Sequence, residues 1–228
     1  GLQVHDHVGA GEFLLAGGDG VAVTAGVRVY EQVSGSSGAM VPVSLSDLAQ
    51  MNIQGSKIVT YHTNTSNMVD YVVLADVTGN AYQYGMLISY AEGDGDNAAI
   101  RWELRPNRSG KQLGNVGYSG RNGSFVGVAF GSGGNVVSIS ALNAIGTAKS
   151  GDFFEKDSHW YVKLNGATYQ VSDSVECYHR SAEDRESTDN WFSQSSGADR
   201  LKAILSYGSS LTLYVDDMSN QVRIIEAK

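Results

Sequence analysis

The sequence predicts an all-β protein with short helices, built from two related β modules that are barrel-like or sandwich-like and internally duplicated. Two observations carry this prediction. Short segments rich in β-branched and aromatic residues recur along the 228-residue chain and are separated by turns rich in glycine. In addition, residues 48–74 are similar in sequence to residues 201–227, so one stretch of the chain occurs twice.

The repeat aligns without a gap at an offset of 153 residues. A second match lies upstream of it, where Val27–Tyr30 corresponds to Val175–Tyr178 at an offset of 148. Since the two offsets differ by five, the second copy has five extra residues, which we place in the polar insertion 183–190. The identical positions of the gapless alignment are Leu48/Leu201, Gly55/Gly208, Ser56/Ser209, Tyr61/Tyr214, Ser66/Ser219, Asn67/Asn220 and Val69/Val222.

Each copy predicts the same series of elements. Ser44 with Asp47, and Ser196 with Asp199, have the spacing of a capping box, so a short helix is expected after each pair. A glycine follows the helix, at Gly55 in the first copy, where a left-handed C-terminal cap is expected. A hairpin comes next, with a polar turn containing Ser-Asn between two apolar strands.

The segment between the two copies is also rich in predicted strands. We assign residues 1–85 to the first β module and residues 86–228 to a larger second module, which carries the repeat at 167–227. The strands expected between the copies are 84–90, 100–105, 125–130, 136–139 and 160–164.

Composition and charge bound the possible partners. The chain has 16 Lys and Arg against 24 Asp and Glu, a net charge of −8, and it has no run of basic residues. Nucleic acid and anionic membranes are therefore not expected as partners, because clustered positive charge dominates binding to both. No apolar stretch is long enough for a membrane helix, so no membrane insertion is expected.

The single cysteine and the first residues of the chain bear on its cellular location. Cys177 alone cannot form a disulfide framework or a CxxC zinc site, and its alternating surroundings predict a packed apolar side chain. The start, GLQVHDHVGAGE, has no basic segment followed by an apolar core. If the protein is exported, its signal peptide was removed before this numbering begins.

Most signatures of enzymes are missing, and we predict that the chain is not an enzyme. The sequence contains neither the phosphate-binding GxxxxGK[ST] motif nor the GxSxG motif of serine hydrolases. The glycine-rich stretch 131–134 lacks the spacing and the following helix of a dinucleotide-binding loop. Carboxylates are plentiful, however, so an Asp/Glu pair of a glycan hydrolase stays open as an alternative.

Asp94, Asp96 and Asn97 lie close together in the sequence EGDGDN. Carboxylate and amide oxygens at short spacing are the ligands that calcium prefers, so these residues are the candidate metal ligands. The glutamate that closes a calcium loop is absent, because position 105 is Arg and Glu103 lies in a predicted strand. A plain acidic hairpin turn is therefore favoured, and no cofactor other than calcium is indicated.

Two residues are candidates for ligand binding. His62 is predicted to lie in the first hairpin turn, where the second copy has Val215, so it is specific to one copy. Decoration of a solvated turn is the alternative explanation for His62. Trp191 lies in the polar insertion 183–196, and an aromatic residue in a charged loop is a typical binding contact, whereas strand tryptophans are expected in the core.

The segment VVLADVTGNAYQYG at 72–85, together with LTLYVDDMSNQVRIIEA at 211–227, resembles the non-catalytic extracellular repeat regions of S-layer-type cell-surface proteins of anaerobic Gram-positive bacteria. The resemblance covers the two repeated units, about half of the chain. The helical wall-binding modules of such proteins are absent from these residues, and the resemblance supplies no functional residues.

These observations favour a non-enzymatic structural or adhesive module of a secreted bacterial surface protein. Other surface-protein domains or glycans are the expected partners. A carbohydrate-binding module is the first alternative, and it requires an exposed row of aromatic side chains. An extracellular glycan hydrolase with an Asp/Glu pair in the middle segment is the second.

Overall fold

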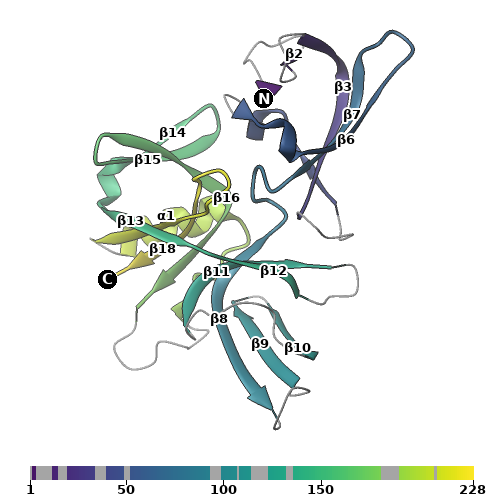
Figure 1. Ribbon diagram of the computed structural model, residues 1–228. Helices are drawn as coiled ribbons and strands as arrows, with labels where there is room; N and C mark the ends of the chain where they lie inside the picture. Colours follow the sequence, from purple (N-terminus) through teal and green to yellow (C-terminus); the bar gives the residue numbers. More distant parts are fainter. Residues whose placement is uncertain are drawn as a thin grey trace. The chain divides into compact units, whose positions relative to one another are not determined.

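The computed structural model is composed mainly of β-strands, with one α-helix and three short 3-10 turns among the residues it describes. The predicted all-β class with short helices is therefore confirmed (Figure 1). The described residues are 2–3, 12–14, 20–33, 40–48, 52–92, 99–106, 108–113, 123–131, 136–180, 190–207 and 210–228.

The chain divides into two compact units. The first unit comprises residues 1–82 with 130–137, and the second comprises residues 83–129 with 138–228. The sequence places the boundary after residue 85 and assigns one continuous segment to each module, whereas the first unit of the structure takes its last residues from the middle of the chain.

The first unit contains a sheet in which a hairpin and a long strand pair in parallel. The sheet order is β2 (Glu12–Leu14), β3 (Gly20–Gln32), β7 (Val69–Ala75) and β6 (Ile58–Thr63), and β4 (Val41–Val43) also pairs with β3. The remaining elements are β1 (Leu2–Gln3), which pairs with β5 (Asn52–Ile53), and the 3-10 turns η1 (Ser46–Leu48) and η2 (Gly55–Lys57).

The second unit is built on a six-stranded sheet and includes a further sheet. The order of the first is β13 (Asn143–Ala148), β17 (Leu211–Val215), β18 (Val222–Ala227), β16 (Ala167–His179), β15 (His159–Leu164) and β14 (Phe153–Lys156). The order of the other is β10 (Arg108–Leu113), β9 (Ala99–Arg105), β8 (Gln83–Glu92) and β11 (Ser124–Phe130), followed by β12 (Val136–Ala141). The last residue of β11 and the first two of β12 are counted with the first unit. The α-helix is α1 (Gly197–Tyr207), and the third 3-10 turn is η3 (Ser150–Asp152).

The duplication seen in the sequence is present in the strand pairing. The long strand of each copy, β3 or β16, pairs in parallel with the return strand of the hairpin, β7 or β18. The offsets of 148 and 153 that align the sequence also convert the partners of one copy into those of the other. The matched partners are Val23–Val69 with Val171–Val222, and Arg28–Tyr71 with Glu176–Ile224. The predicted internal duplication is thus confirmed, including an irregularity at the same place in both pairings.

The structure of the hairpin turns confirms the predicted polar turn that contains Ser-Asn in each copy. Asn67 and Asn220 have positive φ values of 59° and 55°, a conformation that asparagine tolerates better than most residues. In the first turn, the side-chain Oδ1 of Asn64 accepts hydrogen bonds from backbone N–H groups of the turn, at 2.9 and 3.0 Å. In the second turn, Asp216 has this role.

The predicted capping box forms at Ser44 and Asp47, and Ser196 caps the second helix through its hydroxyl, but the helices differ in length. The backbone N–H of Asp199 donates to Ser196 Oγ at 3.1 Å, and the N–H of Asp47 donates to Ser44 Oγ at 3.2 Å. The second copy continues into the eleven-residue helix α1, whereas η1 in the first copy is a 3-10 turn of three residues. The left-handed cap expected at Gly55 is wrong, because this residue begins η2 and is not among the glycines with positive φ.

In each copy, the inner face of the duplicated sheet packs on the segment that follows the capping box. In the second unit, Leu201 and Ile204 of α1 are fully buried in one cluster with Cys177, Leu213 and Ile225. In the first unit, Leu48 of η1 is in the equivalent cluster with Val29, Val72 and Leu74. Since Cys177 and Ile225 face the helix, their neighbours Tyr178 and Glu226 belong to the opposite face, which we call the outer face.

The first testable prediction concerns the close approach of α1 to β16. A Cβ atom added to Gly197 would overlap the carbonyl oxygen of Asp173 and lie 2.9 Å from the backbone nitrogen of Val175. Backbone cannot move aside as a flexible side chain can, so Gly197→Ala is expected to lower the free energy of unfolding by about 1–3 kcal/mol. Urea denaturation followed by circular dichroism measures the change.

Gly151→Ala is the matched control, because a Cβ at Gly151 has no atom within 4 Å and its φ is not positive. This variant is expected to be as stable as the original chain. Equal stability of Gly197→Ala and Gly151→Ala would contradict the packing of α1 described above.

Candidate functional site

A buried ion pair holds the second hairpin. Arg223 on β18 and Asp216 at the end of β17 both have side chains that are 0% exposed, and Arg223 Nε lies 2.6 Å from Asp216 Oδ2. Arg223 also donates to Ser172 Oγ at 2.8 Å, and its guanidinium carbon lies 4.8 Å from the centroid of the Tyr84 ring. Asp216 accepts from the backbone N–H of Ser219 at 2.6 Å. These contacts compensate both charges, so the pair stabilises the turn.

Glu226 is a second buried carboxylate of the same unit. Its Oε1 lies 2.7 Å from Nε of Arg180, and its Oε2 accepts a hydrogen bond of 2.9 Å from the hydroxyl of Tyr214. Glu226 thereby connects three strand ends, those of β16, β17 and β18. Its side chain is 1% exposed, so its oxygens are occupied by protein groups away from solvent.

Glu31 has a comparable role in the first unit. Its carboxylate is fully buried and accepts from the backbone N–H groups of Val77 at 2.8 Å, Thr78 at 3.1 Å and Gly79 at 3.1 Å. It also accepts from the hydroxyl of Thr78. The segment DVTGNAY at 76–82 is therefore fixed to the end of β3 by one carboxylate, as expected for a structural turn.

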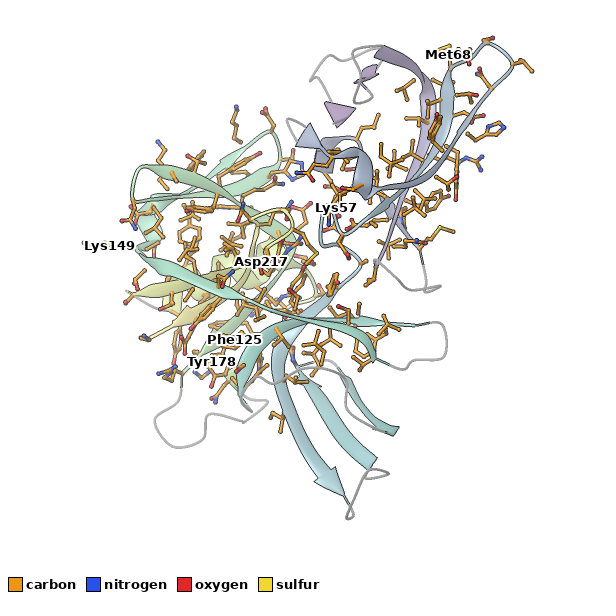
Figure 2. All side chains as sticks on the ribbon, in the orientation of Figure 1. Lys57, Met68, Phe125, Lys149, Tyr178 and Asp217 are labelled. Carbon is orange, nitrogen blue, oxygen red and sulfur yellow. The ribbon has the colours of Figure 1, made fainter. Side chains whose placement is uncertain are left out.

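The outer face of the second unit is covered by aromatic side chains. Phe125 of β11 meets Tyr214 and Tyr178 edge-on, with ring centroids 4.7 and 5.5 Å apart. Trp191 completes the cluster, 5.1 Å from Tyr178 and 6.0 Å from Phe125. Figure 2 shows Phe125 and Tyr178 next to each other within the second unit.

The sequence predicts that Trp191 is an exposed ligand contact. The exposure is wrong, because Trp191 is only 6% exposed. The chain returns to the sheet at this residue and forms an isolated bridge with Tyr178, which turns the indole onto the aromatic cluster. Its indole nitrogen has no hydrogen-bond partner among the described residues. The carbohydrate-binding alternative therefore loses Trp191 as its platform.

The outer face of the first unit carries a different set of side chains. By strand register, Arg28 on β3 lies opposite Tyr71 on β7, and Tyr71 lies opposite His62 on β6. The Arg28 guanidinium carbon lies 5.7 Å from the Tyr71 ring centroid, and the Tyr30 ring lies 5.6 Å from it, tilted by 41°. We call Arg28, Tyr30, Tyr71 and His62 the Tyr71 row.

The predicted turn position of His62 is wrong, because His62 lies within strand β6, where pairing with Tyr71 places it in a group of polar and aromatic side chains. Its Nδ1 lies 2.7 Å from Oδ1 of Asp70, and its side chain is 68% exposed. Arg28 is exposed, and Tyr30 and Tyr71 are half-buried. The row presents a cation, two phenol groups and an imidazole–carboxylate pair to solvent, which is a set of groups able to bind a polar ligand.

The two copies therefore share their strand pairing and differ in the covering of their outer faces. Tyr30 and Tyr178 are equivalent, yet Tyr178 is 1% exposed beneath Phe125 and Tyr30 is half-buried. Tyr61 and Tyr214 are identical in the repeat, but the hairpin register differs by one residue between the copies: Tyr61 lies opposite Val72 of the inner face and is 50% exposed, whereas Tyr214 lies opposite Ile224 of the outer face and contacts Phe125 and Glu226. The shared residues thus maintain the scaffold, and the surroundings of the copies have diverged.

The sequence indicated His62 and missed the rest of the Tyr71 row. The available signal was the alternation along two strands, because Arg28 and Tyr30 are two residues apart and point to the same side as Tyr71. The residues of the second copy that correspond to Arg28 and Tyr71 are Glu176 and Ile224, and both are buried. A comparison of outward-facing positions between the copies would therefore have found the row.

The candidate calcium ligands Asp94, Asp96 and Asn97 lie outside the described residues. Within the described part of the chain, no group of three or more His, Cys, Asp or Glu side chains is arranged to hold a metal ion. The side chain of Glu103 also lies outside the described set.

Cys177 is a free, fully buried cysteine on the inner face of the second sheet, as the sequence predicts. Burial raises the pKa of its thiol far above the ordinary value, which a nearby Arg200 only partly opposes. A thiol in these surroundings stays protonated and packs as an apolar group.

No protein-family model, curated protein or solved structure matches this chain. None of the helices in the described residues has the length and hydrophobicity needed to cross a membrane.

The second prediction tests the Asp216–Arg223 pair. Arg223→Leu removes the cation and leaves the Asp216 carboxylate buried, so it is expected to lower the free energy of unfolding by about 3–5 kcal/mol. The measurement is urea denaturation of the variant. The control is Lys156→Met, because Lys156 and Asp157 form an ion pair of 3.9 Å with side chains that are 70% and 82% exposed.

Lys156→Met is expected to change the free energy of unfolding by less than about 0.5 kcal/mol. If Arg223→Leu lowered the free energy of unfolding as little as Lys156→Met does, Arg223 and Asp216 would have to be accessible to water, which would contradict the burial described above.

The third prediction concerns the reactivity of Cys177. Because burial raises the pKa of its thiol and excludes reagent, Cys177 is expected to remain unlabelled by a thiol-specific disulfide reagent at pH 8 in the native protein. Labelling should become complete in denaturing urea. Stoichiometric labelling of the native chain within minutes would show that the inner face of this sheet is not packed.

Proposed function

We propose that this chain is a non-enzymatic structural and adhesive module of a secreted bacterial cell-surface protein of the S-layer type. The resemblance of residues 72–85 and 211–227 to such proteins supports the surface location. The buried carboxylates Glu31, Asp216 and Glu226 support the structural role, because protein donors occupy each of them. They strengthen turns and strand ends rather than forming a reactive group.

One observation carries the adhesive part of the proposal. The same outer face is covered by Phe125 in the second unit, while in the first unit it exposes the Tyr71 row. Exposed aromatic and arginine side chains are typical of binding surfaces, since their rings and guanidinium groups contribute much contact area for little loss of freedom. The first unit therefore supplies the contact surface and the second unit is the closed counterpart.

Carbohydrate binding is the second candidate function, and the chemistry of the row favours it. The Tyr71 and Tyr30 rings offer apolar surface on which a sugar ring can pack. Arg28 and His62 offer hydrogen-bond donors, and Asp70 is an acceptor next to His62. This row takes the place of the Trp191 platform that the sequence favoured.

The glycan-hydrolase alternative rests on carboxylates of the middle segment. Asp94, Asp96 and the side chain of Glu103 are outside the described residues. Of the described acids in this segment, Asp152 accepts a hydrogen bond from the backbone N–H of Lys149 at 2.7 Å, and Asp157 pairs with Lys156 at 3.9 Å. We keep the hydrolase as an outcome of the experiment below.

The fourth prediction tests the contact surface with the full chain. Applied to a glycan array that includes bacterial cell-wall polysaccharides, the chain is expected to bind at least one glycan. Tyr71→Ala should weaken this binding by about tenfold or more, because it removes the ring at the centre of the row. Tyr161→Ala is the matched control, since Tyr161 stacks on Phe154 at 5.6 Å beside Lys163 in the second unit.

The control variant is expected to bind as the original chain does. If Tyr71→Ala and Tyr161→Ala lost glycan binding equally, or if both variants still bound the glycan, the Tyr71 row would not be the contact surface. Absence of binding to every glycan would remove the carbohydrate candidate, and release of reducing sugar from a bound glycan would overturn the non-enzymatic proposal.

A further inference from the structure

The two copies differ at one edge of the duplicated sheet. In the second unit, the first strand of the hairpin, β17, has β18 on one side and β13 on the other. In the first unit, the equivalent strand β6 has β7 on one side and ends the sheet. Among the described strands none pairs with the free side of β6. The second copy thus contains a strand for which the first copy has no described counterpart.

The pairing of β13 shows what the missing strand would be. It runs antiparallel to β17, with Ala144 opposite Tyr214 and Ala148 opposite Leu211. The offset of 153 converts Tyr214 and Leu211 into Tyr61 and Ile58, which are residues of β6. The free side of β6 is therefore equivalent to an edge that accepts an antiparallel strand elsewhere in the same chain.

The composition and exposure of β6 suit such pairing. Two of the six large apolar side chains that are exposed among the described residues lie on this strand, Val59 at 48% and Tyr61 at 50%. Exposed edge strands are usually protected by charged residues or proline, and β6, IVTYHT, contains no Lys, Arg, Asp, Glu or Pro. Its register shifts lie near its two ends, so Thr60–His62 is a regular central segment.

We propose that β6 is an interaction edge at which a second copy of this chain adds its own β6. A twofold axis places two identical strands antiparallel, which is the direction in which β13 pairs at the equivalent edge. Pairing through β6 joins the sheets of two first units into one continuous sheet. The strand hydrogen bonds supply the attraction, and Val59 and Tyr61 become covered.

The absence of acidic side chains on β6 favours a second copy of the chain as the partner at this edge. The chain has a net charge of −8, so most of its surfaces repel an identical molecule. The six residues of β6 contain no carboxylate, and the neighbouring Asp70 is already paired with His62 at 2.7 Å. This edge is therefore a place where two copies can meet without opposing acidic side chains. The proposal does not depend on glycan binding, because backbone groups of β6 make the contact.

The fifth prediction is a concentration-dependent dimer. Sedimentation equilibrium of the full chain is expected to show a monomer–dimer equilibrium with a dissociation constant tighter than about 1 mM. The double variant Val59→Lys/Tyr61→Lys places positive charges opposite their own copies, so it should weaken dimerisation by about tenfold or more. The matched control, Val137→Lys/Tyr207→Lys, changes two other exposed apolar side chains and should dimerise like the original chain.

Hydrogen–deuterium exchange of the unsubstituted chain provides a second measurement that does not depend on the folding of any variant. Backbone amides of Ile58–Thr63 should exchange more slowly at high than at low protein concentration, while those of His159–Leu164 on β15 should not change. A purely monomeric chain at millimolar concentration would overturn the proposal. So would a dimer in which exchange of the β6 amides is unchanged, or one that only the control variant disrupts.

Discussion

The parallel pairing of a long strand with the return strand of a hairpin is the constraint on which the rest of the structure depends. β3 with β7 and β16 with β18 pair over large separations in sequence, so each pairing fixes which residues face the core and which face outward. A slip of one residue would turn Val29 and Val72 outward and bring Arg28 and Tyr71 into the apolar core. Because the matched partners of both copies are related by constant offsets, the same separation of inner and outer residues is built twice.

The outer faces show how a duplicated scaffold can acquire different roles. In the second unit, the aromatic side chain of Phe125 and the buried charges of Asp216, Arg223 and Glu226 close the face and fasten the hairpin, and the partly exposed Arg180 pairs with Glu226. The first unit has Thr63, Asp70 and Val73 at the positions of Asp216, Arg223 and Glu226, so it lacks these ion pairs. Its hairpin is held by the Asn64 turn instead, and its outer face is left with Arg28, Tyr71 and His62.

Local signals in the sequence were sufficient for the scaffold. The N-terminal caps at Ser44 and Ser196 and the turn asparagines Asn67 and Asn220 act through neighbouring backbone groups, so their spacing alone identified them. The site depended on long-range contacts that spacing does not encode. The sequence places Trp191 within a polar insertion and predicts that it is exposed, but pairing with Tyr178 buries it beneath Phe125, which is distant in sequence. For the same reason, the side-by-side placement of Arg28, Tyr71 and His62 became visible only from the register of three strands.

Hydroxyl-radical footprinting of the tyrosines in the native chain tests most directly the claim that one duplicated sheet has a closed and an open outer face. On the outer face of the first unit Tyr30 and Tyr71 are half-buried, whereas Tyr178, the equivalent of Tyr30 in the second unit, is 1% exposed. We expect measurable oxidation of Tyr30 and Tyr71, together with protection of Tyr178 until the protein is unfolded. Oxidation of Tyr178 at the rate of Tyr71 in the native chain would contradict the account, because the two outer faces would then be equally accessible.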